Sequence, residues 1–322
     1  MEVINLPYRS AILVWRVVSF QFKILNAFKI YIGSAGSIPA RQIERDDNKL
    51  RVIRKSFRRW FIRRFFIYMM SYAERIVNVS VKLFNGDCLE LLNQVKDGSI
   101  DLVLADLPFG MTANKWDSVI PLAPLFEQYQ RVIKPHGAVL LFGMGKFGAN
   151  LIVNAPKNMP YRYDWIWEKS LPVGFLSSHH MPLRAHENVY VFYKHLPTYH
   201  PQMRFGFKPY KGRLNMSGHN YNPASGNYTP RQSAGERFPI DVIKFSNRNN
   251  KNVHPTQKPV DLLQYLIKTY TDEGMTVLDN TMGSGSTGVA AVSLNRNFIG
   301  MELDEEYFKI AQERIEKDGY VK

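Results

Sequence analysis

Residues 277–288 read Val277-Leu-Asp-Asn-Thr-Met-Gly-Ser-Gly-Ser-Thr-Gly288. The apolar start predicts a short buried strand, the glycines predict a tight turn, and a helix is expected from about Ser286. Glycines in such a turn let the backbone approach a ligand closely, and a helix N-terminus leaves backbone N–H groups free. This order of elements is typical of a ligand-binding turn in an α/β protein, although a purely structural strand-to-helix turn can have the same letters.

The position of this turn near the end of the chain indicates an unusual strand order. Its letters also satisfy the G-x-G-x-x-G pattern of dinucleotide sites. Only 34 residues follow Gly288, too few for the rest of a dinucleotide fold unless the order is permuted. The chain ends with a predicted strand at 297–301 followed by a predicted helix at 304–316, and its body starts with another strand at 81–84. A sheet that begins at its third strand and finishes at its second accounts for both ends.

From Ser71 onward, apolar and β-branched runs alternate with helical patterns. The predicted strands are 81–84, 100–105, 137–142, 163–167, 189–193, 276–278 and 297–301, and the predicted helices are 89–95, 121–133, 259–270, 286–294 and 304–316. The alternation predicts an α/β fold with a mostly parallel sheet and helices on both faces. Residues 195–253 break the pattern with many Asn, Gly, Ser, Pro and Tyr residues, so we expect a small inserted region there.

A second motif, Asp106-Leu-Pro-Phe109, follows the apolar run 100–105. In open α/β sheets, ligands bind at the carboxyl ends of the strands. The Asp106 carboxylate and the Leu107 carbonyl can both accept hydrogen bonds from an exocyclic amine, and Phe109 offers a stacking face. Pro108 makes the turn rigid. The motif is therefore suited to hold a flat, amine-bearing ring, although Asp and Pro are also common in ordinary turns that end a strand.

A third motif, His254-Pro-Thr-Gln-Lys-Pro259, precedes the helix that leads into the Gly-rich strand. In this order, the three motifs resemble the β-class DNA amino-methyltransferases, most of all phage-encoded adenine methylases. Residues 165–169 and 184–188 also resemble later motifs of that family, and the resemblance covers about residues 80–322. It implies a permuted Rossmann-like methyltransferase sheet, S-adenosyl-L-methionine as the cofactor and double-stranded DNA as the partner.

The resemblance also implies roles for individual residues. The catalytic residues that hold the target base would be Asp106, Leu107, Pro108 and Phe109. The cofactor-binding residues would be Asp279, Gly283, Gly285 and Glu302, with Asp87 near the cofactor adenine and Lys258 at its methionine end. Residues 71–194 would form the catalytic half, 195–253 the target recognition region and 254–322 the S-adenosylmethionine-binding half.

Three positions depart from the family pattern. Leu107 stands where the family has a first proline, and its backbone carbonyl is retained. Asn280 and Thr281 stand where the family has a proline and an aromatic residue. We expect the changes at Asn280 and Thr281 to alter how the protein packs against the cofactor.

The expected activity is methyl transfer to adenine N6 at a specific site, as in a restriction-modification system, with the base flipped out of the duplex. Asp rather than Ser at position 106 favours adenine over cytosine N4, the main alternative. An NAD-dependent oxidoreductase and a DNA-binding protein with a decayed catalytic fold are further alternatives. The eight histidines show no ligand spacing, so no metal is expected. Members of this family form dimers, so the resemblance also allows a homodimer.

The charge of the chain is concentrated at its start. Its 322 residues contain 42 Lys and Arg against 28 Asp and Glu, a net charge of +14 that favours a polyanionic partner. Residues 1–70 alone hold 14 Lys and Arg against 4 Asp and Glu. One hypothesis is a basic arm, in which aromatic residues alternate with Arg and Lys between Arg51 and Phe66.

The other hypothesis is that this basic extension is not part of the native product. Gly36-Ser-Ile-Pro39 is what GGTTCGATTCC encodes in one frame, which resembles the T-arm of a bacterial tRNA gene. Read-through beside a tRNA gene that carries an integrated prophage would produce it, with a native start at Met69 or Met70.

The remaining composition concerns the compartment. A single cysteine, Cys88, cannot form an internal disulfide and fits a reducing compartment. The apolar stretch 11–32 is interrupted by Arg16, Lys23 and Lys29, so no membrane-spanning helix is expected. We expect a cytoplasmic protein of a bacterium or a phage-infected host.

Overall fold

A computed structural model of the chain describes residues 79–110, 119–211, 232–248 and 257–319. The basic extension, residues 1–70, lies outside these ranges.

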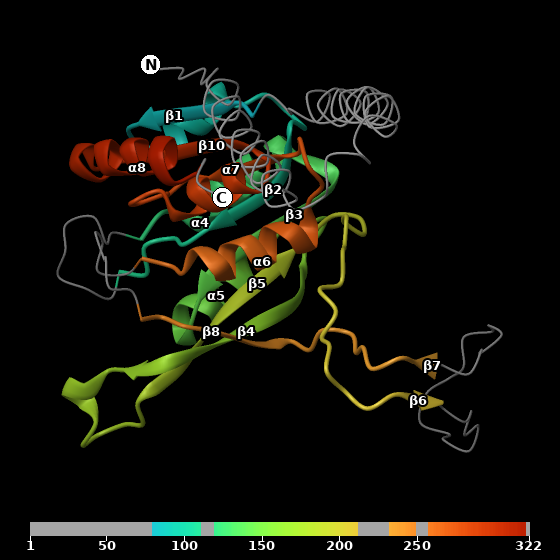
Figure 1. The fold of residues 1–322 in the computed structure, drawn as a ribbon. Helices are drawn as coiled ribbons and strands as arrows, with labels where there is room; N and C mark the ends of the chain where they lie inside the picture. Colours follow the sequence, from blue (N-terminus) through green and yellow to red (C-terminus); the bar gives the residue numbers. More distant parts are fainter. Residues whose placement is uncertain (1–78, 111–118, 212–231, 249–256, 320–322) are drawn as a thin grey trace, which may run out of the picture. The chain divides into compact units, whose positions relative to one another are not determined.

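The centre of the fold is an eight-stranded sheet with the order β1-β10-β9-β2-β3-β5-β4-β8 (Figure 1). From β1 to β3 neighbouring strands are parallel, β5 runs antiparallel to both β3 and β4, and β8 is parallel to β4. The strands are β1 Val81–Asn85, β2 Ile100–Ala105, β3 Ile133–Gly143, β4 Tyr161–Val173, β5 Arg184–Phe192, β8 Val242–Phe245, β9 Thr276–Asp279 and β10 Asn297–Glu302. A separate two-stranded ribbon joins β6 Tyr210–Lys211 to β7 Gln232–Ser233.

Strand β1, the first strand of the sheet along the chain, lies beside β10, the last. The two pair in parallel, with Val81 opposite Phe298 and Asn85 opposite Glu302. The neighbourhood predicted for the two ends of the body is therefore confirmed. The pairing also brings the turn after β1 beside the end of β10, where the Gly86 N–H donates to the Glu302 carbonyl at 2.9 Å.

Two groups of helices cover the sheet, as the alternating pattern predicts. Helices α6, α7 and α8 pack against one another, and α3, α4 and α5 form a second group (Figure 1). Their bounds are α3 Cys88–Leu91, α4 Leu122–Val132, α5 Gly145–Asn154, α6 Val260–Tyr270, α7 Ser286–Ser293 and α8 Glu305–Asp318, with single 3₁₀ turns at η2 Leu92–Gln94 and η3 Phe175–Ser177. The fold is thus an α/β Rossmann-like sheet with helices on both faces.

One helix and one strand of the main sheet were not expected. Helix α5 was missed because glycines are unfavourable in helices. Its Gly148 has a packing reason, since an added Cβ would lie 2.1 Å from the Tyr190 hydroxyl. Strand β8 lies within 195–253, where no strand was predicted, and pairs with β4 through Val242 opposite Ile166. A four-residue strand at a sheet edge is too short to give a periodic signal, so part of the inserted region belongs to the main sheet.

Gly285 gives a stability prediction. It begins α7 with φ +80°, and an added Cβ would lie 2.9 Å from the Cβ of Ala311 in α8. Gly285→Ala is therefore expected to lower the free energy of unfolding by about 1–3 kcal/mol, measured in urea without cofactor. Gly283→Ala is the matched control, because Gly283 also has positive φ (+51°) but an added Cβ meets nothing within 4 Å. Equal losses in the two variants would contradict the packing argument.

Candidate active site

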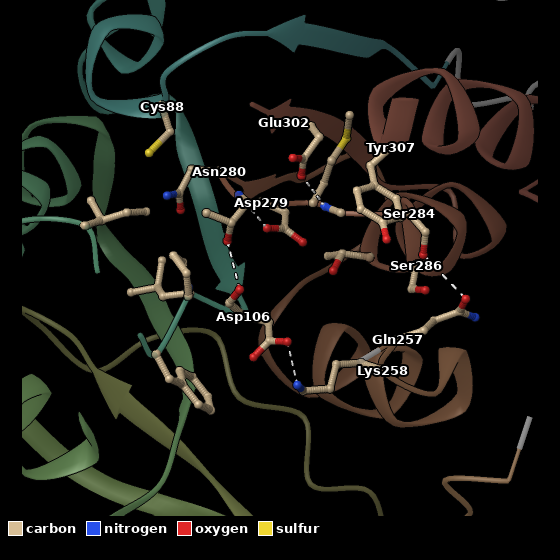
Figure 2. A pocket seen from close by; sticks show the side chains of 18 of the residues that line it. Cys88, Asp106, Gln257, Lys258, Asp279, Asn280, Ser284, Ser286, Glu302 and Tyr307 are labelled. Atoms are coloured by element: carbon tan, nitrogen blue, oxygen red, sulfur yellow. Dashed lines mark hydrogen bonds and ion pairs between the residues drawn. The ribbon is translucent and has the colours of Figure 1, made fainter. Parts of the chain in front are cut away.

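A cavity of about 580 Å³ lies where the carboxyl ends of β1, β2, β9 and β10 meet (Figure 2). This is a usual volume for a site that holds a cofactor or a small molecule. Nine of the ten residues predicted for the site line it: Asp87, Asp106, Leu107, Pro108, Phe109, Lys258, Asp279, Gly283 and Glu302. The first two motifs and Lys258 of the third therefore meet in one cavity, while residues 254–256 of the third motif lie outside the described residues.

Gly285 is the predicted residue that does not line the cavity. It faces Ala311 of α8, whereas Gly283, Ser284 and Ser286 on either side of it are in the wall. The structure thus gives Gly285 a packing role at the start of α7.

Glu302 is held rigidly at the end of β10. Its Oε2 accepts from the Gly283 N–H at 2.8 Å, and its Oε1 accepts from the Asp304 N–H at 2.9 Å. Burial raises the pKa of Glu302, and these two N–H groups oppose that effect. A carboxylate can accept about four hydrogen bonds, so Glu302 keeps capacity to accept from a ligand. Gly283 itself leaves open space where a side chain would be, so the backbone is bare at this point of the wall.

Asp279, at the end of β9, is 3% exposed. Its Oδ1 accepts from the Thr281 N–H at 3.0 Å. Burial raises the pKa of Asp279 to about 7, and the nearby carboxylates Asp106 and Glu302 add to the effect. A cationic ligand would stabilise the ionised form of these three acidic groups, so the cavity is suited to bind positive charge.

Asp106, at the end of β2, is paired with a lysine. Its Oδ2 lies 2.5 Å from the Lys258 Nζ (Figure 2). This Nζ also lies 3.2 Å from the Glu187 Oε1. Burial raises the pKa of Asp106, while the Lys258 ammonium opposes it. Burial alone would lower the pKa of Lys258, but Asp106 and Glu187 outweigh it and hold this pKa above its usual range. Lys258 was expected at the methionine end of the cofactor; its ammonium is found on the predicted catalytic carboxylate.

Glu187 and Lys169 also line the cavity, and neither was assigned a role from the sequence. Glu187 is 4% exposed and binds the Lys169 Nζ at 2.9 Å. Burial raises the pKa of Glu187, but Lys258 and Lys169 outweigh it and hold this pKa below the usual range. Glu187 lies in the polar first half of β5, beside His186 and Asn188, so the local sequence does not mark it as buried. Its partners lie on other elements and could not be read from the local sequence either.

The two polar departures from the family pattern connect separate parts of the site. The Thr281 hydroxyl donates to the backbone carbonyl of Asp106 at 3.1 Å. The Tyr129 hydroxyl of α4 donates to the Asn280 Oδ1 at 2.6 Å. The Gly-rich turn is therefore tied both to β2 and to α4.

Two further properties concern the described ranges only. In this part of the chain no three His, Cys, Asp or Glu side chains gather as they would around a metal ion. No helix found there has the length and apolar character needed to cross a bilayer.

Comparisons with known proteins agree with this geometry. Over 255 residues the chain is 25% identical to the type II methyltransferase M.HpaI of Haemophilus parainfluenzae, covering 74% of both chains. It is 28% identical over 258 residues to the type II methyltransferase M.BglII of Bacillus subtilis, covering 71% of this chain and 67% of the relative.

Among solved structures, the cytosine-N4-specific PvuII DNA methyltransferase superimposes with a TM-score of 0.53 at 16% identity, over 75% of this chain and 86% of the other. TTHA0409 of Thermus thermophilus, a putative DNA modification methylase solved with S-adenosyl-L-methionine, gives a TM-score of 0.50 at 18% identity, over 74% and 94% of the two chains. Both show the shared fold. The sequence model of the DNA methylase family, which joins N6 and N4 enzymes, matches residues 100–313, and the chain belongs to this family.

Proposed function

We propose that the protein is a β-class, site-specific DNA methyltransferase that transfers a methyl group from S-adenosyl-L-methionine to adenine N6 in double-stranded DNA. The observation that carries the proposal is the placement of Asp106 in the same cavity as the Gly283 turn and Glu302. Pairing of β1 with β10 supports the β-class assignment, because it is the strand order that a permuted chain requires.

The residues of the cavity fit the cofactor. S-adenosylmethionine supplies a methyl group on a positively charged sulfur, which makes the methyl carbon electrophilic. The free lone pairs of Glu302 suit the ribose hydroxyls, and Asp279 suits the positive charge of the methionine end. Asp87, whose Oδ1 accepts from the Leu89 N–H at 2.7 Å, also lines the cavity and would lie near the cofactor adenine. The bare backbone at Gly283 allows close approach.

Asp106 and Leu107 prepare the base for attack. The amine of adenine is a poor nucleophile because its lone pair is delocalised into the ring. Hydrogen bonds from its two N–H groups to the Asp106 carboxylate and the Leu107 carbonyl draw the nitrogen toward tetrahedral geometry. During transfer the lone pair would form the new N–C bond, and the electron pair of the S–C bond would remain on the sulfur of the cofactor. Asp106 would accept the proton that the nitrogen loses. Positioning and a carboxylate beside the developing positive charge supply most of the acceleration.

Phe109 supports an extruded base. Its ring packs on Phe147 at a centroid distance of 4.7 Å, which fixes its place in the wall. Removing a base from the duplex costs a few kcal/mol, and stacking on an aromatic ring returns about 1–3 kcal/mol. Residues 195–253 would provide target recognition in this proposal. The β6–β7 ribbon of this region extends away from the sheet (Figure 1).

The proposal is tested by following the methyl group. The protein is incubated with methyl-tritiated S-adenosylmethionine and DNA from a host without DNA methylation, and the DNA is digested to nucleosides and separated. Label in N6-methyl-2′-deoxyadenosine is expected. Label in N4-methyl-2′-deoxycytidine alone would overturn the adenine assignment. A protein that binds NAD but neither binds S-adenosylmethionine nor labels DNA would overturn the proposal. Sequencing with modification detection then gives the recognised site.

Cofactor affinity is expected to depend on pH through Asp279. Because its pKa is raised to about 7, Asp279 is largely protonated below this pH, and a cationic ligand then binds with the loss of one attractive charge. The dissociation constant should therefore fall as pH rises from 5.5 to 8, by up to about tenfold per unit below the pKa. Calorimetry of wild type and Asp279→Asn checks this. The amino group of the cofactor titrates equally with both proteins, so equal pH slopes would contradict the role of Asp279.

A further inference from the structure

Four side chains of alternating charge form a row that ends at Asp106: Lys169, Glu187, Lys258 and Asp106. The N···O distances along it are 2.9 Å for Lys169–Glu187, 3.2 Å for Glu187–Lys258 and 2.5 Å for Lys258–Asp106. The side chains of Lys169, Glu187 and Lys258 are only 11%, 5% and 11% exposed. They come from β4, β5, the segment before α6 and the end of β2, so the row exists only in the folded protein.

The row creates a problem for base binding. Lys258 occupies Asp106 Oδ2, an oxygen of the carboxylate that has to receive the amine of the target base. Once the base takes this position, the ammonium loses its closest partner. A buried charge without a partner costs several kcal/mol, which would oppose seating of the base. Glu187 is the other carboxylate in contact with the same ammonium.

We propose that Glu187 is a positioning residue that receives the Lys258 ammonium when the amine of the target base replaces it on Asp106; this inference rests on the proposed function. Before the base enters, Lys258 bridges the two carboxylates. When the base is seated, Lys258 pairs with Glu187 alone, and Asp106 is free for the base. The ammonium moves between two partners without becoming unpaired, so Asp106 can be kept ionised at little cost to base binding.

The surroundings of Glu187 are suited to this role. Lys169 binds its other oxygen and keeps Glu187 ionised and in place. The Lys169 Nζ lies 5.0 Å from the Trp167 ring centroid, and the Lys258 Nζ lies 5.0 Å from that of Phe142. The rings limit the access of water to the two ammonium groups. Each ammonium therefore depends on a carboxylate partner, because water cannot replace that partner.

The experiment compares variants of the full chain in single-turnover methylation of DNA from a methylation-free host. Glu187→Gln should lower the rate about 10- to 100-fold, as expected for the loss of a supporting partner, with unchanged affinity for S-adenosylmethionine. Its melting temperature should also fall, because Lys169 and Lys258 both lose a buried carboxylate partner. Glu187→Asp, which retains the charge, should recover part of the rate. Glu168→Gln is the matched control, since its partner Lys244 forms an exposed pair at 2.6 Å, and its rate should equal that of the wild type.

A double variant separates position from charge balance. Lys169→Met combined with Glu187→Gln removes one charge of each sign, so the buried charges again cancel, but Lys258 still has no second carboxylate. The proposal requires this variant to remain slow. Recovery of the wild-type rate, or a wild-type rate in Glu187→Gln alone, would overturn it. Failure of the proposed function looks different, because the wild type itself would then transfer no methyl group to DNA.

Discussion

Asp106→Asn is expected to lower the single-turnover rate of methyl transfer by about 10³-fold, equivalent to about 4 kcal/mol of transition-state stabilisation. The substitution keeps the size of the side chain but removes the charge that faces the developing positive nitrogen. It also removes the proton acceptor and introduces an NH₂ group that can face the amine of the base. The rate is measured with tritiated cofactor and saturating DNA.

Binding should separate this effect from misfolding. S-adenosylmethionine and DNA should bind Asp106→Asn nearly as tightly as the wild type, since neither contact depends mainly on this carboxylate. Asp97→Asn is a suitable control, because Asp97 forms an ion pair with Arg131 at the surface and its side chain is 75% exposed. A rate for Asp106→Asn within tenfold of the wild type would show that another group activates the base.

Glu302→Ala should weaken binding of S-adenosylmethionine by at least about 100-fold. Two hydrogen bonds from the ribose to a charged acceptor are lost, each contributing about 1.5 kcal/mol or more. The Gly283 and Asp304 N–H groups also lose their acceptor, so the Gly-rich turn loses its hydrogen bond to the end of β10. Calorimetry with the purified protein gives the dissociation constant directly.

The control for this prediction is Glu305→Ala. Glu305 forms an exposed pair with Lys309 four residues along α8, so its removal should leave cofactor affinity unchanged. Comparable affinity of Glu302→Ala and wild type would contradict the assignment of Glu302 to the ribose. A large loss of cofactor affinity in both variants would instead indicate that cofactor binding responds to negative charge in general near the end of β10.

The sequence by itself determined the elements and the motifs of this protein. Strand β2 was predicted with its observed bounds, because apolar strands and Gly-rich turns are encoded by residues close together in the chain. The late position of the Gly-rich turn, with a predicted strand near each end of the body, was also sufficient to predict that β1 lies beside β10. Nine of the ten residues predicted for the site line one cavity, since parallel strands bring their carboxyl ends to the same edge.

Only the tertiary structure decided how the charged groups are paired. Lys258 and Asp106 are 152 residues apart in the sequence, and no local pattern indicates that the ammonium lies on this carboxylate. Glu187 enters the site because β5 carries it there, antiparallel to both neighbouring strands. Gly285 packs against Ala311 because helices α7 and α8 meet closely. Side-chain partners depend on the distances between separate helices and strands. The packing of the whole fold sets these distances, and no local stretch of sequence encodes them.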